Sequence, residues 1–201
     1  MATQIKRIDQ CADVLPGFAL KVRAEHEPEG AYFYLMAKDL KNTAYLSFHA
    51  DNTEVIRISV DKDVGNYYLK KGDVVFISRG ARNEAAVIGD IPENTIASST
   101  FYILRPKPEV SSDYLTWCIN QLLNLGRLDQ IRTGAATPII QRHNFKEVSI
   151  PVPALEQQQQ IAAIAKIMDE EYQVQLHLLE NTKTMHRIIN KQLLFDNLKF
   201  R

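Results

Sequence analysis

Two short polar segments carry the side chains best suited to bind nucleic acid. Residues 78–84 read SRGARNE and follow an apolar run, and residues 132–144 read RTGAATPIIQRHN. Arginine pairs with phosphate or with guanine, and asparagine and glutamine match the major-groove edge of adenine. The candidate DNA-contacting residues are Arg79, Arg82, Asn83, Arg132, Thr133, Thr137, Gln141, Arg142 and His143. The alternative for each segment is an ordinary solvated loop.

Catalysis and metal binding find little support in the sequence. The chain has five histidines, which are His26, His49, His143, His177 and His186. None stands four residues from another, so no zinc site on a helix is predicted. Cys118 lies in an apolar segment, which favours a buried small hydrophobic residue over a nucleophile. The Asn-Pro-Pro-aromatic motif of adenine methyltransferases needs a Pro-Pro pair that the chain lacks. We therefore expect no catalytic residue, no metal and no cofactor in this chain.

Composition limits the class of protein more than it limits the partner. The chain has 201 residues, of which 24 are Lys or Arg and 24 are Asp or Glu. A neutral net charge gives no sign of a nucleic-acid partner, but a local basic face can still bind phosphate. Two cysteines far apart in sequence predict a reduced, cytoplasmic protein. No apolar run is long enough to predict a signal peptide or a membrane span.

The polar segments must be positioned by a body that spans residues 1–152. Its apolar and alternating runs predict strands over residues 31–37, 54–60, 74–77, 85–90, 100–106 and 148–152. Residues 113–124 have helical spacing, with a cap at Ser111, Ser112 or Asp113 and a stop at Gly126. We predict an α+β domain with a mixed or mainly antiparallel sheet.

The remaining residues, 153–201, read as one long helix behind a proline hinge. Pro151 and Pro153 favour extended backbone before them and suit the first turn of a helix. The helix is predicted to begin near Ala154 and to run to about Leu198, since no proline or glycine interrupts it. Such a helix measures roughly 65 Å, which is more than one small domain needs.

The predicted helix carries an apolar stripe with three-four spacing. The stripe comprises Ile161, Met168, Tyr172, Leu176, Leu179, Ile189 and Leu193. This spacing is typical of a coiled coil and marks these residues as a dimer interface, although Gln175 and Thr182 interrupt the pattern. The alternative is a long helix packed on its own domain. The glutamines at 157–160 are expected to make the first face of the helix polar rather than core-like.

Four strings of the sequence, taken in order, resemble one protein family. They are YYLKKGDVVFISRG (67–80), IASSTFYILRP (96–106), YLTWCIN (114–120) and GAATPIIQRHNFKEVSIPVPALEQQQQIA (134–162). The last is the most informative, because the family repeatedly shows a glycine-led polar loop, a strand ending in Pro-x-Pro, then Leu-Glu-x-Gln and a long helix. From about Tyr32 to its C-terminus, the chain resembles the specificity subunit of type I restriction-modification systems.

The resemblance implies a non-catalytic module that reads double-stranded DNA. It also implies docking to a methyltransferase subunit and, through that subunit, to a nuclease or translocase. S-adenosylmethionine, ATP and Mg are then expected on the partner subunits. The family's usual subunit has two target recognition domains, each followed by a long helix. This chain has one of each, so it resembles a half-length subunit, either natural or a fragment.

A single helix can reproduce the two-helix arrangement of the family by pairing with a copy of itself. We therefore expect a homodimer with an antiparallel coiled coil and a bipartite, palindromic DNA target. A heterodimer with a second half-subunit would read an asymmetric target instead. Two other functions remain open, namely a stand-alone dimeric DNA-binding regulator and a coiled-coil scaffold without DNA. A regulator more often shows a helix-turn-helix, and a scaffold has no need of the two polar segments.

Overall fold

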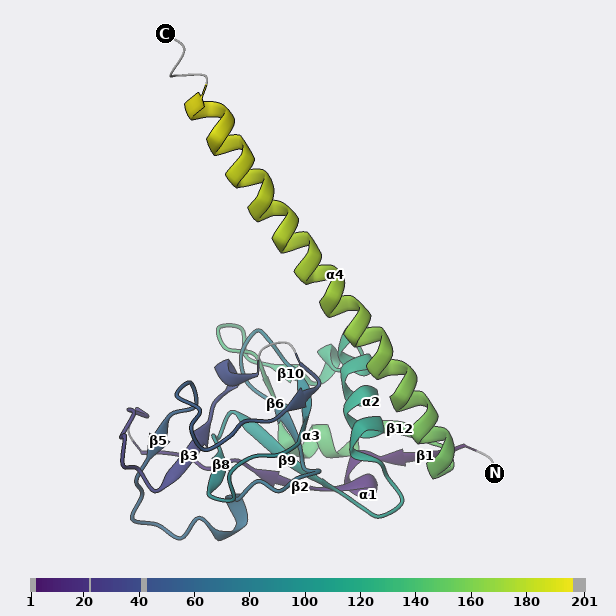
Figure 1. Cartoon of the computed structure of the whole chain (residues 1–201). Coiled ribbons are helices and arrows are strands. Elements are labelled where there is room, and N and C mark those ends of the chain that lie inside the picture. Colours follow the sequence, from purple (N-terminus) through teal and green to yellow (C-terminus); the bar gives the residue numbers. More distant parts are fainter. Residues whose placement is uncertain (1–2, 22, 41–42, 197–201) are drawn as a thin grey trace. The chain divides into compact units, whose positions relative to one another are not determined.

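The computed structural model describes residues 3–21, 23–40 and 43–196 of the chain, drawn as a ribbon in Figure 1. By its internal contacts the chain divides into two units, Met1–Gln159 and Gln160–Arg201. The first unit is here called the body. The second unit contains the greater part of one helix, α4 (Leu155–Asp196).

A five-stranded mixed sheet forms the centre of the body. Its strands, in spatial order, are β2 (Ala12–Pro16), β9 (Phe101–Pro106), β6 (Val74–Ile77), β7 (Ala85–Ile88) and β4 (Tyr45–Leu46). Neighbouring strands are antiparallel, except that β4 runs parallel to β7. All four residues of β6 and of β7 are buried, which explains why these two runs are continuously apolar rather than alternating.

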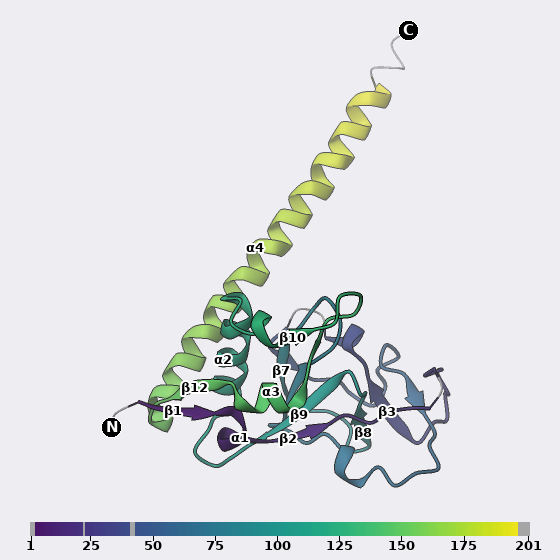
Figure 2. The ribbon, with the colours of Figure 1, turned by 180° about the vertical axis from the view of Figure 1, so that it is seen from behind.

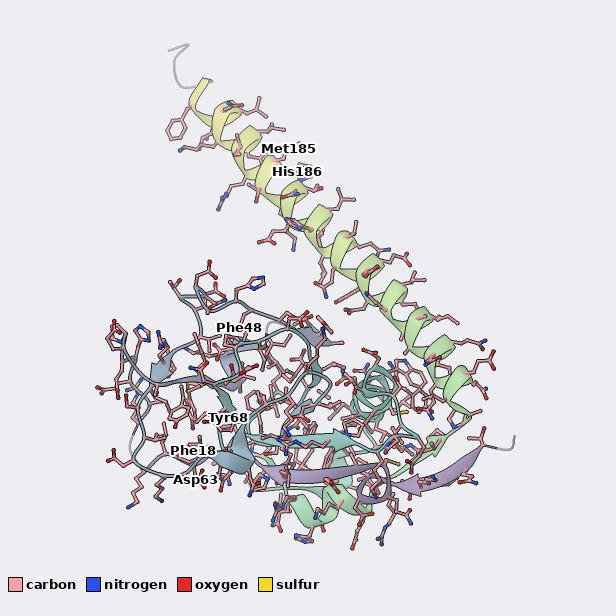
Figure 3. The ribbon with its side chains drawn as sticks, turned by 60° about the horizontal axis from the view of Figure 1, so that its bottom comes forward. Phe18, Phe48, Asp63, Tyr68, Met185 and His186 are labelled. Atoms are coloured by element: carbon pink, nitrogen blue, oxygen red, sulfur yellow. The ribbon has the colours of Figure 1, made fainter. Side chains whose placement is uncertain are left out.

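A second, smaller sheet has three strands, which alternate along the chain with those of the first sheet, and it has its own apolar cluster. It consists of β5 (Arg57–Ile58), β3 (Tyr32–Leu35) and β8 (Thr95–Ala97). Two short 3₁₀ turns, η1 (Ala37–Asp39) and η2 (Gly65–Tyr67), follow β3 and β5. Phe18 packs edge-on against Tyr67 with ring centroids 5.1 Å apart. Figure 3 labels Phe18 and Tyr68 in this part of the body.

The two ends of the body pair with each other. The strand β1 (Gln4–Arg7) is antiparallel to β12 (Ser149–Val152), with Ile5 opposite Pro151 (Figure 2). A proline is tolerated there because β12 is an edge strand on its other side. The helix α1 (Ile8–Cys11) then leads into β2. The backbone carbonyl of Pro151 also accepts a hydrogen bond from the hydroxyl of Tyr114 at 2.8 Å.

Two helices fix the loops of the body. In α2 (Ser112–Asn124), Ser111 is the N-cap and Gly126, with φ of +66°, follows the last turn. The side chain of Asn120 bonds both the N–H and the C=O of Ala85, so α2 is tied to the start of β7. The shorter α3 (Arg142–Glu147) buries Phe145, whose ring stacks on Phe76 at 4.4 Å between centroids.

The predicted fold class is confirmed: the body is α+β with mixed sheets, and a long helix follows it. The strand predicted over residues 54–60 is shorter, at Arg57–Ile58. The carboxamide of Asn52 accepts the N–H groups of Glu54 and Val55, and this turn keeps both residues out of the ladder. The long helix begins at Leu155, and its predicted end near Leu198 lies outside the described residues.

Among the residues that the structure describes, no helix combines the length and the apolar content that crossing a bilayer requires.

Candidate nucleic-acid interface

The structure brings the two polar segments together. Residues 78–84 connect β6 to β7, while residues 132–140 form a hairpin of β10 (Arg132–Thr133) and β11 (Ile139–Ile140) after the turn η3 (Asp129–Ile131). The N–H of Ile140 donates to Ser78 O at 2.9 Å, and that of Gly80 donates to Pro138 O at 2.8 Å. The first segment therefore adds to the edge of the hairpin, and the two form one surface (Figure 1). We call this surface the loop platform.

Each segment contains one glycine that its turn requires. Gly80 has φ of +100°, and Gly134 has φ of +89°. Residues that carry a side chain rarely adopt such positive φ angles, so glycine allows the chain to reverse at both points. A Cβ on Gly134 would also lie 2.7 Å from the carbonyl oxygen of Thr137, which closes the hairpin tip. The glycines in SRGARNE and RTGAATP thus shape the platform.

Two of the nine predicted residues bind each other across the platform. The guanidinium of Arg132 donates to Asn83 Oδ1 at 2.6 Å and pairs with Asp129 at 3.3 Å. The amide nitrogen of Asn83 donates in turn to Ile77 O at 2.8 Å. Since these bonds join the hairpin to the end of β6, Arg132 and Asn83 hold the two segments in register.

A third predicted residue, Arg82, also points its hydrogen bonds inward. Its Nη2 donates to the carbonyl oxygens of Ala37, at 2.9 Å, and of Leu40. Its Nε lies 3.4 Å from the carboxylate of Glu84. The guanidinium therefore links the first polar segment to the backbone around η1, which gives Arg82 a structural task in the free protein.

The other six predicted residues are exposed on the platform or beside it. They are Arg79, Thr133, Thr137, Gln141, Arg142 and His143. Within the described residues, neither Arg79 nor Arg142 forms an ion pair, so both guanidinium groups are available to an anion. Arg142 and His143 open α3, which the buried ring of Phe145 fixes in place.

The platform rests on aromatic side chains of the central sheet. The hydroxyl of Tyr102 donates to the carbonyl of Ile140 at 2.7 Å, and Ile140 itself is fully buried. Phe145 contacts both Phe76 and Tyr102 through its ring. The exposed polar groups of the platform are thus carried on buried aromatic side chains.

The groups with chemical reactivity lie elsewhere. Cys118 is buried, and burial raises the pKa of its thiol to about 11, so the thiol is protonated near neutral pH. No group of three or more His, Cys, Asp or Glu side chains is arranged to hold a metal ion in the described ranges. The platform itself offers hydrogen-bond donors and the positive charge of Arg79 and Arg142.

The predicted dimer interface is exposed along α4. Ile161 is half-buried, and the six other side chains are between 41% and 64% exposed, namely Met168, Tyr172, Leu176, Leu179, Ile189 and Leu193. We call this set the first stripe. Figure 3 shows the side chains that project from α4, with Met185 and His186 labelled.

A second apolar stripe on α4 was missed by the sequence analysis. It comprises Ile167, Val174, Leu178, Met185 and Ile188, which are 52–68% exposed. These positions repeat the three-four spacing of the first stripe on a different side of the helix. A search for every heptad register, and not only the strongest, would have found them.

The expectation that the glutamines at 157–160 make a polar face is wrong for one of them. Gln158 is fully buried in the body, whereas its three neighbours in the run are exposed. A glutamine can be buried where the protein bonds its amide, and three hydrogen bonds do so here. Composition alone does not reveal such partners.

Comparison with known proteins gives a family match over most of the chain. The model of the type I restriction modification DNA specificity domain matches residues 3–181. Among curated proteins, the specificity subunit of the type I restriction enzyme MjaIX from Methanocaldococcus jannaschii is 26% identical over 188 residues. The match covers 93% of this chain and 41% of that subunit.

Solved structures with the same fold give a consistent picture. The HsdS subunit from Thermoanaerobacter tengcongensis superposes with a TM-score of 0.60 at 19% identity, over 84% of this chain and 37% of that one. A chain from a structure of type I restriction-modification complex assembly and conformational transition gives 0.60 at 18%, over 84% and 38%. The chain spans about two fifths of the length of the proteins it matches.

Proposed function

The chain belongs to the family of type I restriction modification DNA specificity domains, and on that premise we propose that it supplies the DNA sequence recognition of a type I restriction-modification complex. Residues 1–152 form the recognition domain that reads the DNA, and the helical part, residues 153–201, joins the chain to its partners. Catalysis belongs to a methyltransferase subunit and to a nuclease or translocase, which bind S-adenosylmethionine, ATP and Mg. The complex acts on DNA in the cytoplasm.

The main support for this proposal is that backbone hydrogen bonds join the two polar segments into one surface. Backbone bonds hold both segments on one platform, so their exposed side chains face the same ligand. Arg79 and Arg142 supply the forked donors that bind guanine or phosphate, and Gln141 supplies an amide that matches adenine. Arg82, Asn83 and Arg132 act at the same surface, where their internal bonds set the positions of the contacting groups.

The first stripe of α4 supports pairing of two copies. Apolar side chains exposed along a long helix are normally covered by another helix, and twofold closure is the commonest way to do so. We propose an antiparallel coiled coil between two chains. Two identical readers related by a twofold axis bind inverted half-sites, so the target is a bipartite palindrome.

The second stripe offers a place for the methyltransferase. Once the first stripe is covered by a second copy, the second stripe still presents Ile167, Val174 and Leu178, which are 65–68% exposed. A helix with apolar residues on two sides is typical of a bundle of more than two helices. We therefore assign the second stripe to a helical segment of the methyltransferase subunit.

A DNA titration with and without the methyltransferase subunit tests the proposed function. The net charge of the chain is zero, which limits the release of counterions, so the chain alone is expected to bind duplex DNA weakly. Fluorescence anisotropy should show strong, sequence-specific binding only when the methyltransferase is present. Tight binding by the chain alone would instead favour a stand-alone regulator.

Methylation mapping in cells that express the complete system tests the symmetry of the target. A homodimer predicts methylated adenines in a palindromic pair of half-sites with a constant spacer. An asymmetric pair of half-sites would contradict the homodimer and favour a heterodimer with a second specificity chain.

A further inference from the structure

One glutamine in the run at 157–160 differs from the others in its surroundings. Gln157, Gln159 and Gln160 are exposed, whereas Gln158 has no exposed surface. All four lie in the first turns of α4, and Gln158 belongs to the body by its contacts. The role of this residue is not accounted for by DNA contact or by either stripe.

The carboxamide of Gln158 bonds three separate pieces of backbone. Its Oε1 accepts a hydrogen bond from the N–H of Ser111 at 2.9 Å. Its Nε2 donates to the carbonyls of Glu109, at 3.0 Å, and Pro153, at 2.9 Å. An amide supplies both the acceptor and the two donors that this site needs, which a carboxylate or a methyl group does not.

The three bonded residues are turning points of the body. Glu109 and Ser111 lie between β9 and α2, and Ser111 caps α2. Pro153 follows β12 and is itself buried. The backbone N–H of Gln158 also donates to Ala154 O at 3.0 Å, so the bonded turn is the first hydrogen-bonded turn of α4. Gln158 therefore joins the start of α4 to the exit from β12 and to the cap of α2.

We propose that Gln158 is the positioning residue that locks the first turn of α4 to the reading body, and that this lock determines the DNA spacer accepted by the assembled complex. The inference rests on the proposed function, because it assumes two readers connected by helices. With the turn locked, the first turn of α4 stays bonded to the reader at Glu109, Ser111 and Pro153. Without it, the two readers adapt to half-sites at several separations.

Hydrogen exchange on the full chain tests the lock without DNA or partner. The variant Gln158→Met keeps the length and volume of the side chain and removes its three hydrogen bonds, and Gln159→Met is the matched change at an exposed position. We expect the amides of residues 158–162 to exchange at least about tenfold faster in Gln158→Met, since local opening then breaks fewer bonds. Gln159→Met should exchange as the wild type does. Equal exchange in all three proteins would overturn the lock.

A second variant serves as a control for a general loss of folding. Gln158→Glu keeps the acceptor for Ser111 and loses both donors, so it should give the same local acceleration of exchange. In both variants the amides of β6 and β9 should stay as protected as in the wild type. If β6 and β9 lose protection together with residues 158–162 in both variants, Gln158 serves the stability of the body and the proposal fails.

A spacer series tests the functional half of the inference. Binding of the complex with the methyltransferase is measured on DNA whose half-sites are separated by the preferred spacer and by one base pair more or less. The wild type and Gln159→Met should discriminate equally, while Gln158→Met should lose at least about threefold of that discrimination, because one base pair rotates a half-site by roughly a tenth of a turn. Affinity for a single half-site should not change.

The two experiments separate the inference from the proposed function. If the wild type shows no spacer preference, the bipartite reading fails, and the exchange experiment alone decides whether Gln158 locks the turn. If exchange accelerates but the spacer profile of Gln158→Met matches the wild type, the lock exists and its proposed role in spacing is wrong.

Discussion

The body buries most of its large apolar side chains, whereas α4 exposes many of its own. In the body, Phe76, Ile103 and Leu104 are fully buried, and each packs on its own chain. Along α4, Ile167 and Leu178 are 65% exposed, and the helix is held by its own backbone bonds. The body therefore gains its stability from contacts within the chain, whereas the helix presents apolar surface that is suited to a partner.

This difference predicts which measured property a substitution will change. A change in the core of the body alters the free energy of unfolding. A change on a stripe of α4 alters association and leaves the body folded. A substitution that changes both the stability of the body and the association of α4 would contradict this separation.

The largest effect is expected from a charge in the first stripe. Leu179→Glu keeps a good helix former but places a carboxylate at the centre of the proposed coiled coil. Both chains of the dimer carry the new carboxylate, so the dissociation constant of the dimer should rise at least about 100-fold, or roughly 3 kcal/mol. Light scattering on the purified chain should then report the monomer mass, with the urea midpoint of the body unchanged.

The matched control for this charge is Thr184→Glu. Thr184 is exposed and lies on the side of α4 away from the first stripe. It should leave the dimer intact. Loss of the dimer in both variants would point to helix unwinding, and a wild-type chain that is itself monomeric would contradict the role of the first stripe.

The next effect concerns the core beneath the loop platform. Phe145→Ala removes a fully buried ring that stacks on Phe76. Truncations of this kind cost about 3–5 kcal/mol, so the free energy of unfolding measured in urea should fall by that amount. The mass from light scattering should stay that of the wild type. Glu147→Ala, an exposed change in the same helix, should shift stability by less than about 0.5 kcal/mol.

The sequence predicted the elements of the body that have strong local signals. The apolar runs at β6, β7 and β9 and the capped helix α2 follow from periodicity and capping. The strands β1 and β2 were missed, because Gln4–Arg7 and Ala12–Pro16 are short and lack an apolar pattern. Their pairing with β12 and β9 is set by residues more than 80 positions away, which local patterns do not encode.

The sequence identified the residues of the candidate site but not their arrangement in space. Composition identified both polar segments, since arginine, asparagine and glutamine cluster there. The bond between Arg132 and Asn83 spans 49 positions, and the bonds of Arg82 to Ala37 and Leu40 span more than 40. Whether an arginine faces DNA or its own backbone depends on such distant partners, so sequence alone ranks Arg79 and Arg82 as equals.

The smallest expected effects distinguish these two arginines within one loop. Arg82→Ala removes hydrogen bonds to two backbone carbonyls and should lower the free energy of unfolding by about 1 kcal/mol. Arg79→Ala removes a guanidinium with no ion pair in the described residues, and should leave stability within about 0.5 kcal/mol of the wild type. Urea denaturation of the two variants measures this difference directly.

DNA binding by the complex completes the comparison of the two arginines. Arg79→Ala should weaken specific binding by about 1–3 kcal/mol if the side chain contacts a base, and Arg79→Lys should not restore it, because lysine lacks the planar fork. If Arg79 binds only phosphate, Arg79→Lys restores affinity, and the salt dependence of binding is that of the wild type.

Arg82→Ala should weaken DNA binding only as far as the loss of stability disturbs the platform. Part of the lost affinity should therefore return when binding is measured at a lower temperature, at which the variant is more stable. The reverse ranking, with Arg82→Ala fully stable and deficient in DNA binding, would mean that Arg82 leaves Ala37 and Leu40 to contact the DNA.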